Sequence, residues 1–168
     1  GFGAGDILVC AFGILSPTKL NQRLLQAWLK SRLAQDKACH LVFVGENHPG
    51  EYGHELLATI RRNHAEENIH ITGWTEQEVY RHYLAAADIA VQLRTLSRGE
   101  TSAAVLDCMN YGLATVVNAN GSMADLDKEA VWMLPDKFSD EQLIETLEIL
   151  RQDEARRSEM GENARKII

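Results

Sequence analysis

Short apolar runs alternate along this chain with longer segments in which apolar residues recur every three or four positions. The runs are four to six residues long, and we expect six buried strands, at 7–12, 40–44, 69–72, 89–93, 114–117 and 130–134. Helical spacing predicts helices between and after them, over about 18–34, 52–66, 75–87, 100–112, 139–150 and 154–168. Short strands separated by helices are typical of a parallel sheet with helices on both faces. The sequence therefore predicts a three-layer α/β fold, a doubly wound, Rossmann-like sheet of six parallel strands.

The order of the strands indicates where a ligand would bind. Right-handed crossovers favour the order 3-2-1-4-5-6, with strands numbered along the chain. The topological switch then lies between the first and fourth strands, and ligands bind outside the carboxyl ends of strands at such a point. Two loops leave those ends, at 13–18 and 94–100. We expect the functional site between them.

The second of these loops carries the residues best suited to an anion. Arg98, Gly99, Glu100, Thr101 and Ser102 lead into a helix that is predicted to open at Glu100 and to close near residue 112. A helix N-terminus offers unpaired N–H groups and partial positive charge, both of which suit a phosphate. The alternative is an ordinary helix cap, because Thr and Ser start helices of every kind. The position at the switch point favours a phosphate or diphosphate site.

Two further charged residues belong to the same hypothesis. Lys19 opens the first predicted helix beside the switch, where an ammonium group reaches a bound phosphate as a point charge. Asp107 lies among apolar residues inside the helix that follows the fourth strand, and there it needs a polar partner. For each of them the alternative is a solvated residue on the outer face of its helix.

Composition narrows the class of protein. The chain has 168 residues, of which 45% are hydrophobic, so we expect one globular domain over 1–168 with its own core. The net charge of −7 disfavours nucleic acid as a partner. Cys10, Cys39 and Cys108 have no C-x-x-C spacing and are interpreted as buried thiols of a reducing compartment. With no signal peptide and no apolar run of membrane-spanning length, the prediction is a cytoplasmic location.

Several common motifs are missing from the printed sequence. The segment 12–18 after the first strand is not G-x-G-x-x-G, which disfavours NAD, and there is neither a P-loop nor a G-x-S-x-G elbow. The histidines do not lie at metal-ligand spacings. Asp125 and Asp127 form a D-x-D string that can hold a divalent metal, but such pairs are frequent by chance, and we expect no metal site. Trp74 follows the third strand on the ligand side, whereas the other two tryptophans are expected to pack in the core.

Taken in order, short segments of the chain resemble the carboxyl-terminal half of a GT-B glycosyltransferase of glycosyltransferase family 4 (glycosyl transferases group 1). They are Phe12-Gly13 with Thr18-Lys19, Val44-Gly45-Glu46, Asn68-Ile-His-Ile-Thr-Gly73, Tyr83-Leu-Ala-Ala-Ala-Asp88, Leu106-Asp-Cys-Met-Asn-Tyr-Gly112 and Val116-Val117. Each segment is weak alone, and their shared order and spacing over nearly the whole chain carry the resemblance.

The resemblance implies a site for a nucleotide diphosphate sugar, with no cofactor. It implies that Lys19 contacts the diphosphate, that Asp107 contacts the ribose hydroxyls, and that the loop 99–102 contacts the sugar and the phosphates. Gly45, Glu46, Gly73 and Trp74 would lie near the base and ribose. The complete set expected to bind the donor is Gly13, Gly45, Glu46, Gly73, Trp74, Gly99, Thr101, Ser102 and Asp107, and the residues expected to serve the transfer itself are Lys19, Arg98 and Glu100.

Three departures from the family pattern change this expectation. Ile14 stands where the family has an arginine, so Arg94 or Arg98 would have to replace one phosphate charge. The carboxylate at Asp107 is one methylene shorter than the family's glutamate. The first acid of the family's Glu-x7-Glu pattern would fall on Gly99, with Glu100 one residue late.

The resemblance also implies partners outside this chain. GT-B enzymes place the acceptor site in an amino-terminal domain, which 168 residues cannot include. We therefore expect a donor-binding fragment of an enzyme that transfers a hexose or related sugar, with retention, to a saccharide or a lipid-linked glycan, and that works in the cytoplasm or at the inner face of the membrane. The isolated fragment would bind the donor with little turnover. Two alternatives stay open: half of a nucleotide-sugar epimerase, which would need acid and base groups across the cleft, and a non-catalytic nucleotide-binding module.

Overall fold

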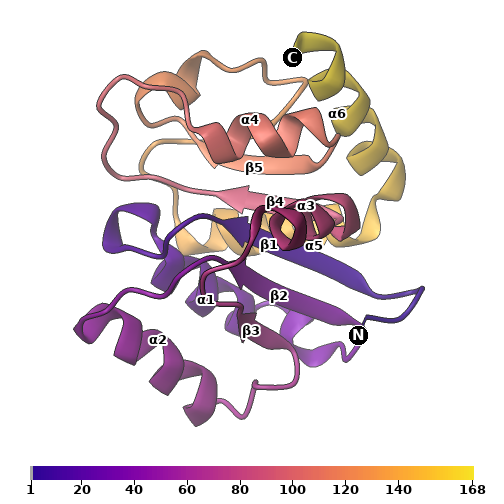
Figure 1. Cartoon of the computed structure of the whole chain (residues 1–168). Coiled ribbons are helices and arrows are strands. Elements are labelled where there is room, and N and C mark those ends of the chain that lie inside the picture. The colour runs from indigo at the N-terminus through magenta and orange to yellow at the C-terminus, as the bar shows by residue number, and fades with distance from the viewer. Residues whose placement is uncertain (1) are drawn as a thin grey trace.

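The computed structural model describes residues 2–168 and contains one sheet of six parallel strands. The strands run in the order β3-β2-β1-β4-β5-β6, which confirms the predicted doubly wound sheet (Figure 1). Their bounds are β1 (Ile7–Phe12), β2 (Cys39–Val44), β3 (Ile69–Ile71), β4 (Ile89–Gln92), β5 (Ala114–Asn118) and β6 (Trp132–Leu134).

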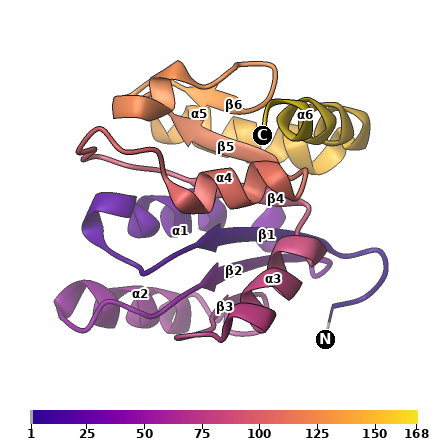
Figure 2. The same cartoon turned by 45° about the horizontal axis from the view of Figure 1, so that its top comes forward.

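Helices cover both faces of this sheet. Figure 2 shows α3 and α4 in front of the strands, with α1 and α5 behind them. The α-helices are α1 (Asn21–Lys30), α2 (Glu51–Arg62), α3 (Gln77–Ala86), α4 (Ala103–Asn110), α5 (Asp140–Gln152) and α6 (Glu154–Ile167), and the short 3-10 helices are η1 (Pro17–Lys19), η2 (Arg32–Gln35) and η3 (Gly121–Asp125). Among residues 2–168, no helix has both the length and the apolar character needed to cross a bilayer.

The continuous apolar runs in the sequence follow from the position of the sheet between two layers of helices. In β1, Val9 and Ala11 join the core under α1, α2 and α5, while Leu8, Cys10 and Phe12 join the core under α3 and α4. Successive side chains of a strand point to opposite faces, so a strand covered on both sides needs apolar residues at every position.

Three predicted helix starts are wrong, and in each case the local backbone explains the difference. The predicted helix 18–34 is divided at Leu20, whose left-handed φ of 55° separates η1 from α1. The helix predicted to begin at Thr75 begins after Glu76 as α3, because the backbone at Glu76 is still extended, and no side chain caps it. The helix predicted to open at Glu100 begins at Ala103 instead.

The last strand is also shorter than predicted. Residues 130–131 are apolar and buried, but their N–H groups donate to the Asp127 carbonyl at 3.0 and 3.1 Å. These bonds hold them in a turn, so β6 begins at Trp132. The ends of the elements depend here on hydrogen bonds that an apolar pattern does not encode.

Candidate functional site

The crevice at the topological switch opens where β1 and β4 stop pairing. Their ladder holds only Val9 with Ile89 and Cys10 with Ala90. Beyond it the side chain of Gln92 takes over: the Phe12 N–H donates to Gln92 Oε1 at 2.6 Å, and Gln92 Nε2 donates to the Phe12 carbonyl at 3.0 Å. One side-chain amide thus takes the place of the next backbone hydrogen-bonded pair of the sheet, and Gln92 lines the crevice.

A cavity of about 200 Å³ lies at this crevice. It is lined by Ala11, Phe12, Lys19, Asn21, Val91, Gln92, Leu93, Arg94, Ser102, Ala103 and Ala104. The lining contains two cationic side chains, Lys19 and Arg94, and no Asp or Glu within the described chain. In a protein of net charge −7, this local excess of positive charge favours an anionic ligand.

Lys19 is held against the backbone of the β1 loop. Gly13 has φ +110°, and a Cβ atom at that position would lie 2.6 Å from Lys19 Nζ, so the ammonium occupies space that only glycine leaves free. Burial, and secondly the neighbouring charge of Arg94, lower the pKa of Lys19. Both causes disfavour the charged form of Lys19, and a bound anion would offset both.

Arg94 follows β4 and is fixed through its backbone. Its N–H donates to Asn118 Oδ1 at 2.8 Å, and its carbonyl accepts from Asn118 Nδ2 at 2.7 Å. Asn118 is fully buried at the end of β5. The Arg94 side chain keeps 24% of its surface exposed, and its Nη1 lies 4.0 Å from Oε1 of Glu100, which does not line the cavity.

The amino terminus of α4 completes the cavity. Its free backbone amides are not those of the helix predicted to open at Glu100, because α4 begins at Ala103. Ser102 is the N-cap: its Oγ accepts from the Val105 N–H at 3.4 Å, and its carbonyl accepts from the Leu106 N–H at 3.1 Å. The first turn of a helix leaves its leading N–H groups without helical partners. These are the amides of Ala103 and Ala104, both lining the cavity.

The loop before α4 keeps its residues out of the helix. Gly99 has φ +92°, and Arg98, Gly99, Glu100 and Thr101 are all exposed. The prediction that the backbone from Glu100 to Ser102 forms the helix start is therefore wrong by about one turn. Whether these four residues contact a ligand stays a prediction.

Asp107 has the polar partner that its apolar surroundings require. Tyr80 of α3 donates its hydroxyl to Asp107 Oδ2 at 3.0 Å, and Asp107 Oδ1 makes no hydrogen bond within residues 2–168. The Tyr80 ring packs edge-on against Phe12 at 5.4 Å between centroids. Burial, and then the bond to Asp107, raise the pKa of Tyr80, so the phenol stays protonated and donates. Through Tyr80 and Phe12, Asp107 is connected to the wall of the cavity.

The loops after β2 and β3 lie along the same edge of the sheet. A Cβ on Gly45 would lie 2.1 Å from the Gly13 carbonyl oxygen, so Gly45 allows the two loops to touch. The Leu15 N–H donates to the Glu46 carbonyl at 3.0 Å, and the Gly45 N–H donates to Thr72 Oγ1 at 3.0 Å.

Beyond Thr72, Gly73 turns the chain with φ +75°, and Trp74 is 72% exposed. The structure thus places Lys19 and Ser102 in the lining of the cavity and Gly13 against Lys19. Gly45 and Glu46 contact the Gly13 loop through the backbone, and Gly73 and Trp74 lie further along the edge. The contribution of each to binding stays a prediction.

Sequence reasoning missed three residues of this site. Gln92 and Asn118 join neighbouring strand ends, and Tyr80 holds Asp107. The available signal was a lone amide at the end of an otherwise apolar strand, at Gln92 and at Asn118. A polar side chain there has to pair with the backbone of the next strand.

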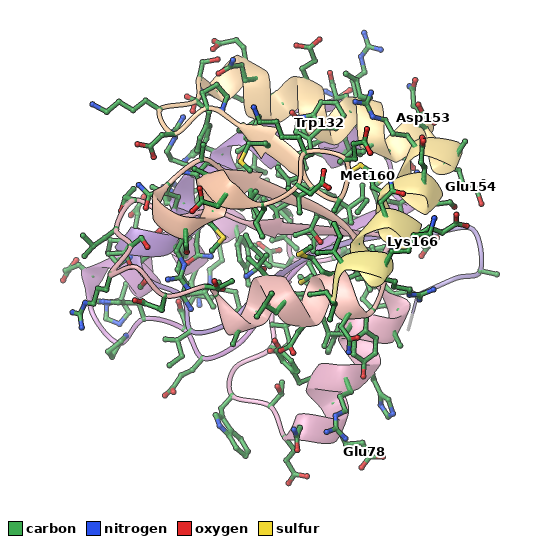
Figure 3. The ribbon with its side chains drawn as sticks, turned by 90° about the horizontal axis from the view of Figure 1, so that it is seen from above. Glu78, Trp132, Asp153, Glu154, Met160 and Lys166 are labelled. Carbon is green, nitrogen blue, oxygen red and sulfur yellow. The ribbon has the colours of Figure 1, made fainter. Side chains whose placement is uncertain are left out.

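A larger cavity, of about 490 Å³, lies between β6 and α6. Figure 3 labels two of its lining residues, Trp132 of β6 and Met160 of α6. Its lining balances two cations with two anions, Lys128 and Arg156 with Glu129 and Glu159, so it has no charge preference. The Arg156 guanidinium already stacks on Trp132, 4.3 Å from the ring centroid. Across residues 2–168, no three His, Cys, Asp or Glu side chains gather as metal ligands.

Solved structures with the same fold include the C-terminal domain of a glycosyl transferase. HepE (Alr3699) of Anabaena, in complex with UDP, superposes with a TM-score of 0.82 at 21% identity over 98% of this chain and 44% of that one. The C-terminal domain of the group 1 glycosyl transferase LpcC from Francisella tularensis gives 0.84 at 20% identity over 96% and 84%. Sucrose-phosphate synthase from Thermosynechococcus elongatus gives 0.81 at 18% identity over 98% and 41%. The chain therefore spans less than half the length of HepE.

A search of curated protein sequences gave no match. The sequence profile of the family Glycosyl transferases group 1 matches residues 1–167, which is nearly the whole chain. The doubly wound sheet and the cationic crevice at its switch point agree with that match. The chain belongs to the glycosyl transferases group 1 family.

Proposed function

We propose that this chain is the donor-binding domain of a retaining glycosyltransferase and binds a nucleoside diphosphate sugar at the β1–β4 crevice. The observation that carries the proposal is the cavity lined by Lys19, Arg94 and the first amides of α4, without a carboxylate among its lining residues. A diphosphate is the part of such a donor that this chemistry recognises. The UDP complex of HepE supports UDP as the first probe.

The proposed chemistry is stabilisation of the leaving group. When the bond between sugar and diphosphate breaks, negative charge grows on the diphosphate, and fixed donors aimed at it lower the barrier. Lys19 supplies a charge held against Gly13, and the amides of Ala103 and Ala104 supply oriented dipoles. Asp107, oriented by Tyr80, would accept hydrogen bonds from the ribose hydroxyls through its unpaired Oδ1.

The rest of the reaction would take place outside this chain. The acceptor would be a saccharide or a lipid-linked glycan. The site that binds and orients it would belong to an amino-terminal domain, in line with the small share of HepE that the chain covers. An oxygen of the donor phosphate would take the proton of the acceptor. The transferred sugar would be a hexose or a close relative.

The direct test is calorimetric titration of the purified chain with UDP, UMP and inorganic pyrophosphate. We expect UDP to bind more tightly than UMP, because the second phosphate adds charge-assisted contacts at the crevice. GDP and ADP in the same assay identify the preferred base. If UDP binds no better than UMP, the diphosphate site is wrong.

Asp107→Asn should weaken UDP binding by about tenfold and leave pyrophosphate binding unchanged. The asparagine keeps an oxygen for the Tyr80 hydroxyl but lacks the charge that strengthens bonds to ribose, a loss of about 1–2 kcal/mol. Pyrophosphate has no ribose, so its affinity should not depend on these hydrogen bonds. Glu162→Gln, on the exposed surface of α6, controls for the loss of one negative charge. Equal losses for UDP and pyrophosphate would contradict the ribose assignment.

UDP affinity should fall as pH rises through the lowered pKa of Lys19. The lysine binds the diphosphate as an ammonium, and burial makes the free site lose its proton below the ordinary lysine pKa of about 10.4. Binding at alkaline pH, below that ordinary pKa, should therefore take up protons. Calorimetry in buffers of different ionisation enthalpy measures this uptake, which should disappear in Lys19→Met. If proton uptake on binding is unchanged in Lys19→Met, a group other than Lys19 takes up the proton.

A further inference from the structure

We propose that Arg94 supplies the second fixed positive charge for the diphosphate, in place of the arginine that the family motif has where this chain has Ile14. The inference rests on the proposed function and specifies one residue of its site. Ile14 is 60% exposed on the β1 loop and offers no charge to the cavity.

Position is the first argument for Arg94. It lines the same cavity as Lys19, and its charge contributes to the lowered pKa of that lysine. The two cations therefore repel one another across a space that no carboxylate of the lining enters. A dianion between them would turn this repulsion into two attractions, since each cation would meet an opposite charge at short range.

Rigidity is the second argument. Asn118 holds both backbone polar groups of Arg94, and the next residue, Thr95, donates its N–H to the Thr18 carbonyl at 2.9 Å. That bond ties the start of the Arg94 loop to the turn that carries Lys19. The backbones that carry the two cations are thus tied together before any ligand binds, and such preorganisation is what charge stabilisation requires.

Arg98, the other replacement that the sequence allows, lacks both properties. It is exposed and does not line the cavity, and within the described chain no hydrogen bond holds its backbone as Asn118 holds that of Arg94. Glu100 is the present counter-ion of Arg94, at 4.0 Å and outside the lining of the cavity. A diphosphate entering the cavity would replace this distant carboxylate as the partner of the guanidinium.

The test compares Arg94→Gln and Arg94→Met with Arg98→Gln by calorimetric titration with UDP and UMP. Arg94→Met keeps the apolar stem, so that a loss seen in both Arg94 variants is a loss of charge. We expect each to weaken UDP binding about tenfold or more while UMP binding falls less, so the preference for UDP over UMP drops. Arg98→Gln should change that preference less. Arg61→Gln, exposed at the carboxyl end of α2, is the matched control for one lost positive charge.

The outcomes separate this inference from the proposed function. A parental preference for UDP in both Arg94 variants, or a loss in Arg98→Gln as large as in Arg94→Gln, overturns the assignment of Arg94 while UDP binding by the parent still stands. If the parent itself does not prefer UDP, the proposed function and this inference both fail. Thermal unfolding of each variant confirms that the compared proteins are folded.

Discussion

Lys19→Met should weaken the binding of UDP by about ten- to a hundredfold, the largest loss expected from a single side chain of this site. A hydrogen bond to a charged group contributes about 1.5–3 kcal/mol, and one factor of ten in affinity corresponds to about 1.4 kcal/mol. Lys19 should lie at the upper end of the range because it is partly buried, where charge interactions are screened less than at the surface. Methionine keeps the apolar stem and removes the ammonium group.

The measurement is calorimetric titration with UDP at about physiological ionic strength, near 0.15 M. Lys30→Met is the matched control, since Lys30 is exposed in the last turn of α1, at the opposite edge of the sheet. The control should bind UDP like the parent. If Lys19→Met also binds UDP like the parent, the diphosphate does not bind beside Lys19, whatever the variants of other residues show.

The parts of the fold that could be predicted are those in which burial determines whether a residue must be apolar. A strand buried on both faces must be apolar throughout, as β1 is, so six apolar runs identified six strands, and crossover handedness gave their order. The expected ligand edge followed from topology, and the structure places Lys19 and Ser102 around one cavity there, with Gly13 against Lys19.

The parts that could not be predicted depend on backbone conformation and on long-range bonds of polar side chains. The left-handed Leu20 is a leucine, a residue type that rarely adopts positive φ, so nothing in the sequence marks the break before α1. The start of α4 depends on Gly99, whose positive φ excludes the loop from the helix. The partners of Gln92 and Asn118 are 80 and 24 residues away, a separation that no local pattern reports.

Asn118→Ala should destabilise the protein by about 2–4 kcal/mol, the largest stability effect expected at the site. The Asn118 side chain bonds the N–H and carbonyl of Arg94 and, at 3.3 Å, the carbonyl of Asp136, and it is fully buried. Its removal leaves these three backbone groups without their side-chain partner, at a cost of about 1–3 kcal/mol for each group that water cannot reach. Urea unfolding measures the loss. Asn110→Ala, exposed at the end of α4, should stay within about 0.5 kcal/mol of the parent.

The same variant links stability to binding. If Asn118 positions Arg94, then Asn118→Ala should also lower the preference for UDP over UMP under conditions in which the variant is folded, although Asn118 does not line the cavity. A purely structural role would lower stability and leave that preference at the parental value. A small change in stability together with a parental preference would mean that neighbouring groups or water satisfy the Arg94 backbone, and that the end of β5 has no part in positioning this charge.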